Sequence, residues 1–157
     1  MTDTATRSIA HAQFAIERDV PVAPAVAFQA FADPTIKSKW FGGEEGWEQG
    51  EVSADFRVGG VEINEGTFQE TMTSRFVATY TDIVENERLV YTYDMWLNGA
   101  HISTSVATWE FEPTTIGTKL TLVEFGAHLD GHDTGAQREE GTRELVEALA
   151  KYLESVA

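Results

Sequence analysis

The feature that most constrains this chain is residues 135–156, a long segment with a sustained helical period. Apolar side chains recur there at spacings of three and four, which predicts a helix with one apolar stripe. The stripe consists of Leu145, Leu149, Tyr152 or Leu153, and Val156. Thr134 or Asp133 can cap this helix, which would be roughly 30 Å long. Such a stripe needs a surface to cover, and the preceding chain must supply it.

The preceding chain is predicted to form antiparallel strands and two short helices. Alternating patterns and segments rich in β-branched and aromatic residues indicate the strands. They are expected at 10–20, 47–58, 61–65, 75–84, 89–97, 101–112 and 118–125. The short helices, over 24–32 and 33–40, follow the first strand, and residues 71–74 fit either a loop or a strand start. This order predicts an α+β fold, with a meander of six to seven strands covered by the long helix.

Two dipeptides mark the tightest turns. Gly59-Gly60 suits a hairpin turn that needs a positive φ angle. Asn98-Gly99 is the strongest two-residue hairpin signal in the chain. Turns of this kind join neighbouring strands, so they support a meander.

Composition and charge limit the partners. The chain has 157 residues, a formal net charge of -15 at pH 7 and no cysteine. Its length suits a single domain spanning 1–157, with residues 1–9 loose. Nucleic acids and anionic membranes would repel so acidic a protein, and disulfides or thiolate chemistry are excluded. Neither a signal-peptide pattern nor a span of about 20 apolar residues is evident, so we expect a cytoplasmic protein.

Strand parity predicts which side chains face the long helix. Successive side chains point to opposite sides of a sheet, so alternate residues share a face. The inward residues would be Leu89, Tyr91, Tyr93, Met95 and Leu97; His101, Ser103, Ser105, Ala107, Trp109 and Phe111; and Leu120, Leu122 and Glu124. The inner face of the strand expected at 101–112 is therefore polar at its N-terminal end and apolar at its C-terminal end. Either that end is exposed at the sheet rim, or the space under the helix is a partly polar cavity.

Short motifs in a fixed order run through nearly the whole chain, from Phe14 to Leu153. They are Asp33-Pro34 to Trp40-Phe41-Gly42, Asp55-x-Arg57-x-Gly59-Gly60, Ile83 to Glu87-Arg88-Leu89, Glu112-Pro113, and Gly117-Thr118-x-Leu120-x-Leu122. The ordered set resembles the homologues of the heat-shock-protein ATPase activator, in the START-like (SRPBCC) superfamily with the birch-pollen-allergen-type helix-grip fold. The motifs near the long helix resemble a bacterial subgroup of that family.

This resemblance implies a curved antiparallel sheet that grips the C-terminal helix, with a cavity for a hydrophobic or amphipathic small molecule. The superfamily includes ligand carriers, polyketide cyclases and chaperone regulators, so the fold alone does not select a function. The family also implies an aromatic residue after the glycine near the helix start, where this chain has Gly141-Thr142. Threonine there predicts a roomier and more polar pocket. A homodimer is compatible with the habit of the family.

Candidate catalytic residues are few. The sequence lacks the G-x-S-x-G, H-E-x-x-H, P-loop and G-x-G-x-x-G motifs. His101 and Ser103 would be neighbours on one strand face, without a visible third member of a nucleophilic triad. Glu124 would face the cavity, where burial would raise its pKa and suit it to acid/base catalysis. Alternatively, it is a rim glutamate, exposed or paired with Arg138.

Four potential metal ligands, His128, Asp130, His132 and Asp133, fall within six residues. The motif of the bacterial subgroup contains the two aspartates but not the histidines, which implies loop geometry and helix capping. We therefore expect no metal.

Three aromatic residues, Trp40, Phe41 and Trp47, flank a glycine-rich break. They are either part of the core or an aromatic mouth to the cavity. In the second case a mobile Gly42-Gly43 hinge could admit a ligand.

The leading hypothesis is a cytoplasmic helix-grip protein that binds a small hydrophobic molecule and needs no cofactor. Its ligand-binding residues would be Trp40, Phe41, Trp47, Phe68, Tyr91, Tyr93, Met95, His101, Ser103, Ser105, Trp109, Glu124, Arg138 and Thr142. One alternative is an enzyme of the cyclase or hydrolase type, with Glu124 or His101 as acid/base. Another is a module that regulates a chaperone ATPase.

Overall fold

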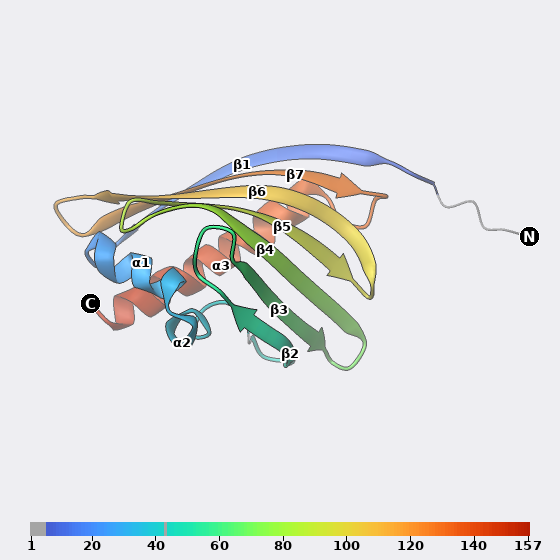
Figure 1. The fold of residues 1–157 in the computed structure, drawn as a ribbon, viewed down its shortest axis with the longest axis horizontal. Helices are drawn as coiled ribbons and strands as arrows, with labels where there is room; N and C mark the ends of the chain where they lie inside the picture. The colour runs from blue at the N-terminus through green and yellow to red at the C-terminus, as the bar shows by residue number, and fades with distance from the viewer. Residues whose placement is uncertain (1–5, 43) are drawn as a thin grey trace, which may run out of the picture.

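A computed structural model describes residues 6–42 and 44–157. In chain order the elements are β1 (Ile9–Val20), α1 (Pro24–Ala32), α2 (Pro34–Lys37), β2 (Trp47–Ala54), β3 (Val61–Phe68), β4 (Met72–Val84), β5 (Arg88–Leu97), β6 (Ala100–Pro113), β7 (Thr118–Leu129) and α3 (Gly135–Ser155). Figure 1 shows a single curved sheet, with α3 lying along its concave side and α1 and α2 near one end. The predicted helix-grip fold is confirmed. Within the described residues, none of the helices is long and apolar enough to cross a bilayer.

The strands form one antiparallel sheet in the order β1-β7-β6-β5-β4-β3-β2. The strands β2 to β7 follow one another as a meander, and β1 adds to the edge of β7, with Ile9 opposite Leu129 and Val20 opposite Thr118. The predicted turn at Asn98-Gly99 joins β5 to β6, and both residues have positive φ angles, 50° and 82°. These are the backbone angles that favour an Asn-Gly hairpin.

The strand ends differ from the sequence prediction where pairing extends or ends a strand. The strand expected to start at 75 begins at Met72, because residues 72–74 pair with the end of β3. The strand expected to end at 125 continues to Leu129 because it pairs with the start of β1. In contrast, β2 ends at Ala54 rather than at 58. Hydrogen bonds to neighbouring strands decide where these strands end, and such bonds cannot be predicted from local composition.

The N-terminal segment is only partly described, because residues 1–5 lie outside the described range. The backbone N–H of Ser8 donates to Asp130 at 3.0 Å, and β1 begins at Ile9. The described part of the segment expected to be loose is therefore attached to the turn after β7.

Helix α3 divides into two halves with different surroundings. Its N-terminus has a capping box, in which Thr134 and Gln137 exchange side-chain and backbone hydrogen bonds of 2.9 and 3.1 Å. The helix packs against β1 and α1. Its buried residues all lie in the C-terminal half; they are Val146, Leu149, Ala150 and Leu153. Val156 was predicted in the stripe, but it is 48% exposed just beyond the last turn. The N-terminal half carries polar side chains, and a pocket lies between it and the sheet.

Candidate functional site

The pocket between the sheet and the first turns of α3 has a volume of about 420 Å³. Ligand sites in proteins typically have volumes of about 300–1,000 Å³. Apolar side chains from the middle of the sheet and from α3 form its walls, including Phe76, Leu122 and Leu145. Exposed residues of β2, such as Glu48 and Val52, also line it, so the pocket is open to solvent between β2 and α3.

Most of the residues predicted from the sequence line this pocket. They are Phe41, Trp47, Tyr91, Tyr93, Met95, Trp109, Glu124, Arg138 and Thr142. Trp40 instead lies in the core, where its indole N–H donates to the carbonyl of Ala30 at 2.8 Å. Phe68 packs on Trp47, with 5.3 Å between ring centres. Neither Trp40 nor Phe68 is part of the lining.

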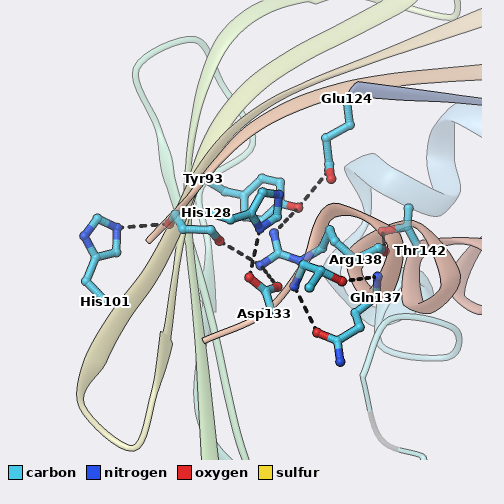
Figure 2. Close-up of polar contacts among 10 residues, drawn as sticks. Tyr93, His101, Glu124, His128, Asp133, Gln137, Arg138 and Thr142 are labelled. Atoms are coloured by element: carbon cyan, nitrogen blue, oxygen red, sulfur yellow. Dashed lines mark hydrogen bonds and ion pairs between the residues drawn. The ribbon is translucent and has the colours of Figure 1, made fainter. Parts of the chain in front are cut away.

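His101 was predicted to share the inner face with Ser103, and this placement is wrong. Met95 pairs with Ser103 but the next residue, Trp96, pairs with His101, so Ile102 is an extra residue in β6. Such a bulge reverses the alternation of side chains. His101 therefore lies on the convex face of the sheet, stacked on Trp96 with 4.9 Å between ring centres. Figure 2 shows it on the far side of the sheet from Arg138.

Glu124 lies inside the pocket and is 4% exposed. The hydroxyl of Tyr93 donates to Glu124 Oε1 at 2.7 Å and accepts from Arg138 Nη1 at 3.1 Å (Figure 2). The alternative of a rim glutamate paired directly with Arg138 is therefore wrong. Tyr93 connects the buried carboxyl to the guanidinium group.

Arg138 continues this network towards the loop before α3. Its Nη2 donates to Ser103 Oγ at 2.7 Å and to Asp133 Oδ2 at 2.9 Å. Asp133 Oδ1 lies 2.8 Å from Nδ1 of His128, and an ionised carboxylate can only accept, so the imidazole donates. Three strands and one helix thus contribute to one buried polar network, drawn in Figure 2.

Small residues beneath the network make room for it. In the sheet register Tyr93 lies opposite Ser105, and Ser105 lies opposite Gly126. A Cβ atom at Gly126 would be 2.8 Å from Ser105 Oγ and 3.0 Å from His128 Nε2. Ser105 is 1% exposed, and its Oγ has no hydrogen-bond partner within the described residues. Ser103 and Ser105 therefore lie behind the pocket wall and do not line it.

The surroundings of Glu124 change its protonation. Burial raises the pKa of the Glu124 carboxyl above its ordinary value, and the bond from Tyr93 and the charge of Arg138 only partly oppose this shift. Burial also raises the pKa of the Tyr93 hydroxyl, and the adjacent Glu124 raises it further. Tyr93 is therefore a neutral donor at physiological pH.

The free energy of unfolding of Glu124→Gln is expected to rise relative to that of the wild-type protein as pH increases. A carboxyl with a raised pKa holds its proton more tightly in the folded than in the unfolded state, so wild-type stability falls between the unfolded and folded pKa values. Glutamine does not titrate and keeps an acceptor for Tyr93. Denaturant unfolding across this pH range should show the difference growing by about 1.4 kcal/mol per unit of pKa elevation. The matched control is Glu85→Gln at an exposed site, and a difference independent of pH would contradict the expectation.

A second buried polar group, missed in the sequence, lies at the α2 side of the pocket. Lys37 Nζ donates to Glu62 Oε1 at 2.8 Å, and the hydroxyl of Tyr80 donates to the same oxygen. Both Lys37 and Glu62 are less than 10% exposed, and both line the pocket. No face of β3 is predicted from the sequence; in the structure Val61 is 41% exposed and Glu62 points inwards. Strand alternation would have placed Glu62 on the inner face only if Val61 and Ile63 had been assigned to the outer face.

The residues considered as metal ligands form hydrogen bonds and ion pairs in and around the loop before α3. His128 and Asp133 bind each other, while Asp130 accepts from Ser8 and Arg7. Across residues 6–42 and 44–157, no group of three or more His, Cys, Asp or Glu side chains is arranged to hold a metal. Of the suggested hinge, Gly42 lines the pocket with a φ of 76°, and Gly43 lies outside the described residues.

The fold and pocket together define a helix-grip protein of the START-like class. Residues 21–154 match the family model described as activator of Hsp90 ATPase homolog 1-like protein, and the chain belongs to this family. None of the curated proteins matches it.

Solved structures agree with this assignment. The chain is 41% identical to the Mll3558 protein from Rhizobium loti, with a TM-score of 0.86 over 93% of this chain and 99% of the other. It is 35% identical to an uncharacterized protein from Rhizobium leguminosarum, with a TM-score of 0.91 over 96% and 99% of the two chains. An AHSA1-like protein from Aeromonas hydrophila, at 18% identity and a TM-score of 0.67 over 92% and 94%, shares the fold.

Proposed function

We propose that this protein binds a small hydrophobic or amphipathic molecule in the pocket under α3. The observation that carries the proposal is the pocket itself, about 420 Å³ in volume, with aromatic walls and a buried polar network at one end. An apolar cavity with a few convergent polar groups is the usual form of a small-molecule site. The expected homodimer and the expected cytoplasmic location stay predictions.

The enzyme alternative now depends on Glu124 alone. His101 lies on the convex face, so these two residues cannot act on one ligand position. Glu124, with a raised pKa and a position in the pocket, supports an acid/base role more than any other residue predicted from the sequence. The chaperone-regulating alternative stays a prediction.

Native mass spectrometry of protein purified from its own host tests the proposal directly. A co-purifying small molecule, released on denaturation and absent from a pocket-filled variant, is the expected result. A preparation without any bound molecule, combined with failure of apolar probes to bind, would contradict the proposal.

Thr142→Phe is expected to lower the affinity for a neutral apolar probe by at least about tenfold. Thr142 lines the pocket from α3, so a phenyl ring there would occupy ligand space. Fluorescence titration with N-phenyl-1-naphthylamine measures the affinity. Thr142→Val, which has nearly the shape of threonine, is the matched control and should keep it. Unchanged binding in the phenylalanine variant would place the probe elsewhere on the protein.

A further inference from the structure

We propose that the pocket selects an amphipathic organic cation, that is, an ammonium group carried on an apolar body. This inference rests on the proposed function, because it names the ligand class of the same pocket. Three features support it: a buried carboxyl with an unused oxygen, two cations already held by carboxylates, and walls rich in aromatic rings.

The unused oxygen belongs to Glu124. Its Oε1 accepts from Tyr93, and its Oε2 has no donor among the described residues. Glu124 as a whole is only 4% exposed, yet it lines the pocket. This oxygen is accessible from the pocket, because Ser105 Oγ is the one side-chain nitrogen or oxygen atom of the described residues that is both fully buried and without a partner. A ligand that brings a positive charge or an N–H donor into the pocket can therefore pair with Glu124 Oε2.

The two cations of the pocket are already paired with carboxylates. Lys37 donates to Glu62 at 2.8 Å. Arg138 directs its Nη atoms at Asp133, Tyr93 and Ser103, at distances of 2.7 to 3.1 Å. An anionic ligand would compete with Glu62 and Asp133 for these cations and would be repelled by both carboxylates.

Charge and aromatic character in the rest of the lining favour a cation as well. Six carboxylate side chains line the pocket, against two basic ones. The carboxylates are Glu44, Glu48, Glu62, Glu65, Glu124 and Asp133. Burial raises the pKa of the Tyr91 hydroxyl, and the negative charges of Glu124 and Glu62 raise it further. Faces of Tyr and Trp rings attract ammonium groups, and more strongly when water is excluded.

Three probes with the same chain and different head groups test the inference. We would titrate decyltrimethylammonium, decanol and decanoate into the wild-type protein by calorimetry, below their micelle concentrations and at two salt concentrations. The expected result is that the ammonium compound binds about tenfold more tightly than decanol, and that decanoate binds most weakly.

Two pocket variants and one surface variant show whether a preference for the cation comes from the pocket or from the net charge of the protein. Glu124→Gln should weaken decyltrimethylammonium about tenfold and change decanol by less than about twofold. Thr142→Lys adds a cation to the pocket lining, so it should weaken the ammonium compound about tenfold more than decanol, while the length of lysine takes ligand space from both. Glu85→Gln removes an exposed charge and should leave all three affinities unchanged.

The outcomes distinguish this inference from the proposed function. Equal binding of decanol and the ammonium compound, in a ratio that neither pocket variant changes, overturns the ligand class and leaves the small-molecule site in place. Tightest binding of decanoate overturns the ligand class in the same way. Failure of all three probes to bind wild-type protein overturns the small-molecule site itself. An effect of Glu85→Gln equal to that of Glu124→Gln would assign the cation preference to the surface.

Discussion

Glu62→Leu is expected to lower the free energy of unfolding by about 3–5 kcal/mol. The side chain is 4% exposed and accepts hydrogen bonds from Lys37 and Tyr80 on one oxygen. Removing it leaves a buried ammonium group without a counter-charge and a buried hydroxyl without an acceptor. Both consequences are costly because little water reaches either group: Lys37 is 7% exposed and Tyr80 2%. Denaturation in urea, followed by fluorescence and circular dichroism together, measures the loss.

The triple variant Lys37→Met, Glu62→Leu and Tyr80→Phe is the control for this change. It replaces the whole polar group by apolar side chains of similar volume, which in buried sites often costs little. We expect its stability to return to within about 2 kcal/mol of the wild-type value. If the triple variant were as unstable as Glu62→Leu alone, the loss would come from packing and not from the unpaired charge.

Trp109→Ala is expected to cost about 3–5 kcal/mol and to enlarge the pocket. Trp109 is 2% exposed, its ring centre lies 4.8 Å from that of Phe31, and its indole N–H donates to the Tyr91 hydroxyl at 3.1 Å. Alanine therefore leaves a cavity and also a buried hydroxyl without its donor. Because native domains are stable by only about 5–15 kcal/mol, this change brings the protein close to unfolding.

Trp109→Phe separates the two contributions. Phenylalanine keeps most of the apolar volume but has no N–H. The loss of unfolding free energy in Trp109→Phe should therefore be less than half of the loss in Trp109→Ala. The free energy of unfolding and the denaturant slope of both variants give the answer. A loss below about 1 kcal/mol in Trp109→Ala would contradict the assignment of this residue to the core.

The main features of the fold could be predicted because their signals are local. The period of three and four residues in α3 and the Asn98-Gly99 turn each depend on residues that are close in sequence. The same holds for Glu124, because regular alternation continues along β7 to that residue. Of the two positions that the sequence left open for Glu124, the structure has the inward one, with the raised pKa that burial causes.

The failures occurred where one strand depends on another. The extra residue Ile102 in β6 moved His101 to the convex face, and the bulge is defined only by pairing with β5. Glu62 was missed because the sequence does not show that Lys37 and Tyr80, 25 and 18 residues away, are its partners. A charged residue is predicted to lie on the surface unless a partner that can pair with it in the interior is known.

By itself the sequence determined the type and order of the elements, the helix that covers the sheet, and the polar character at the first turns of that helix. Those properties come from patterns over a few residues, which backbone geometry converts into faces. Only the tertiary structure decided that Arg138 joins Tyr93, Ser103 and Asp133, and that Lys37 lies against Glu62. Both arrangements depend on strand register and on the position of helices along the sheet, which are set by contacts between residues far apart in the chain.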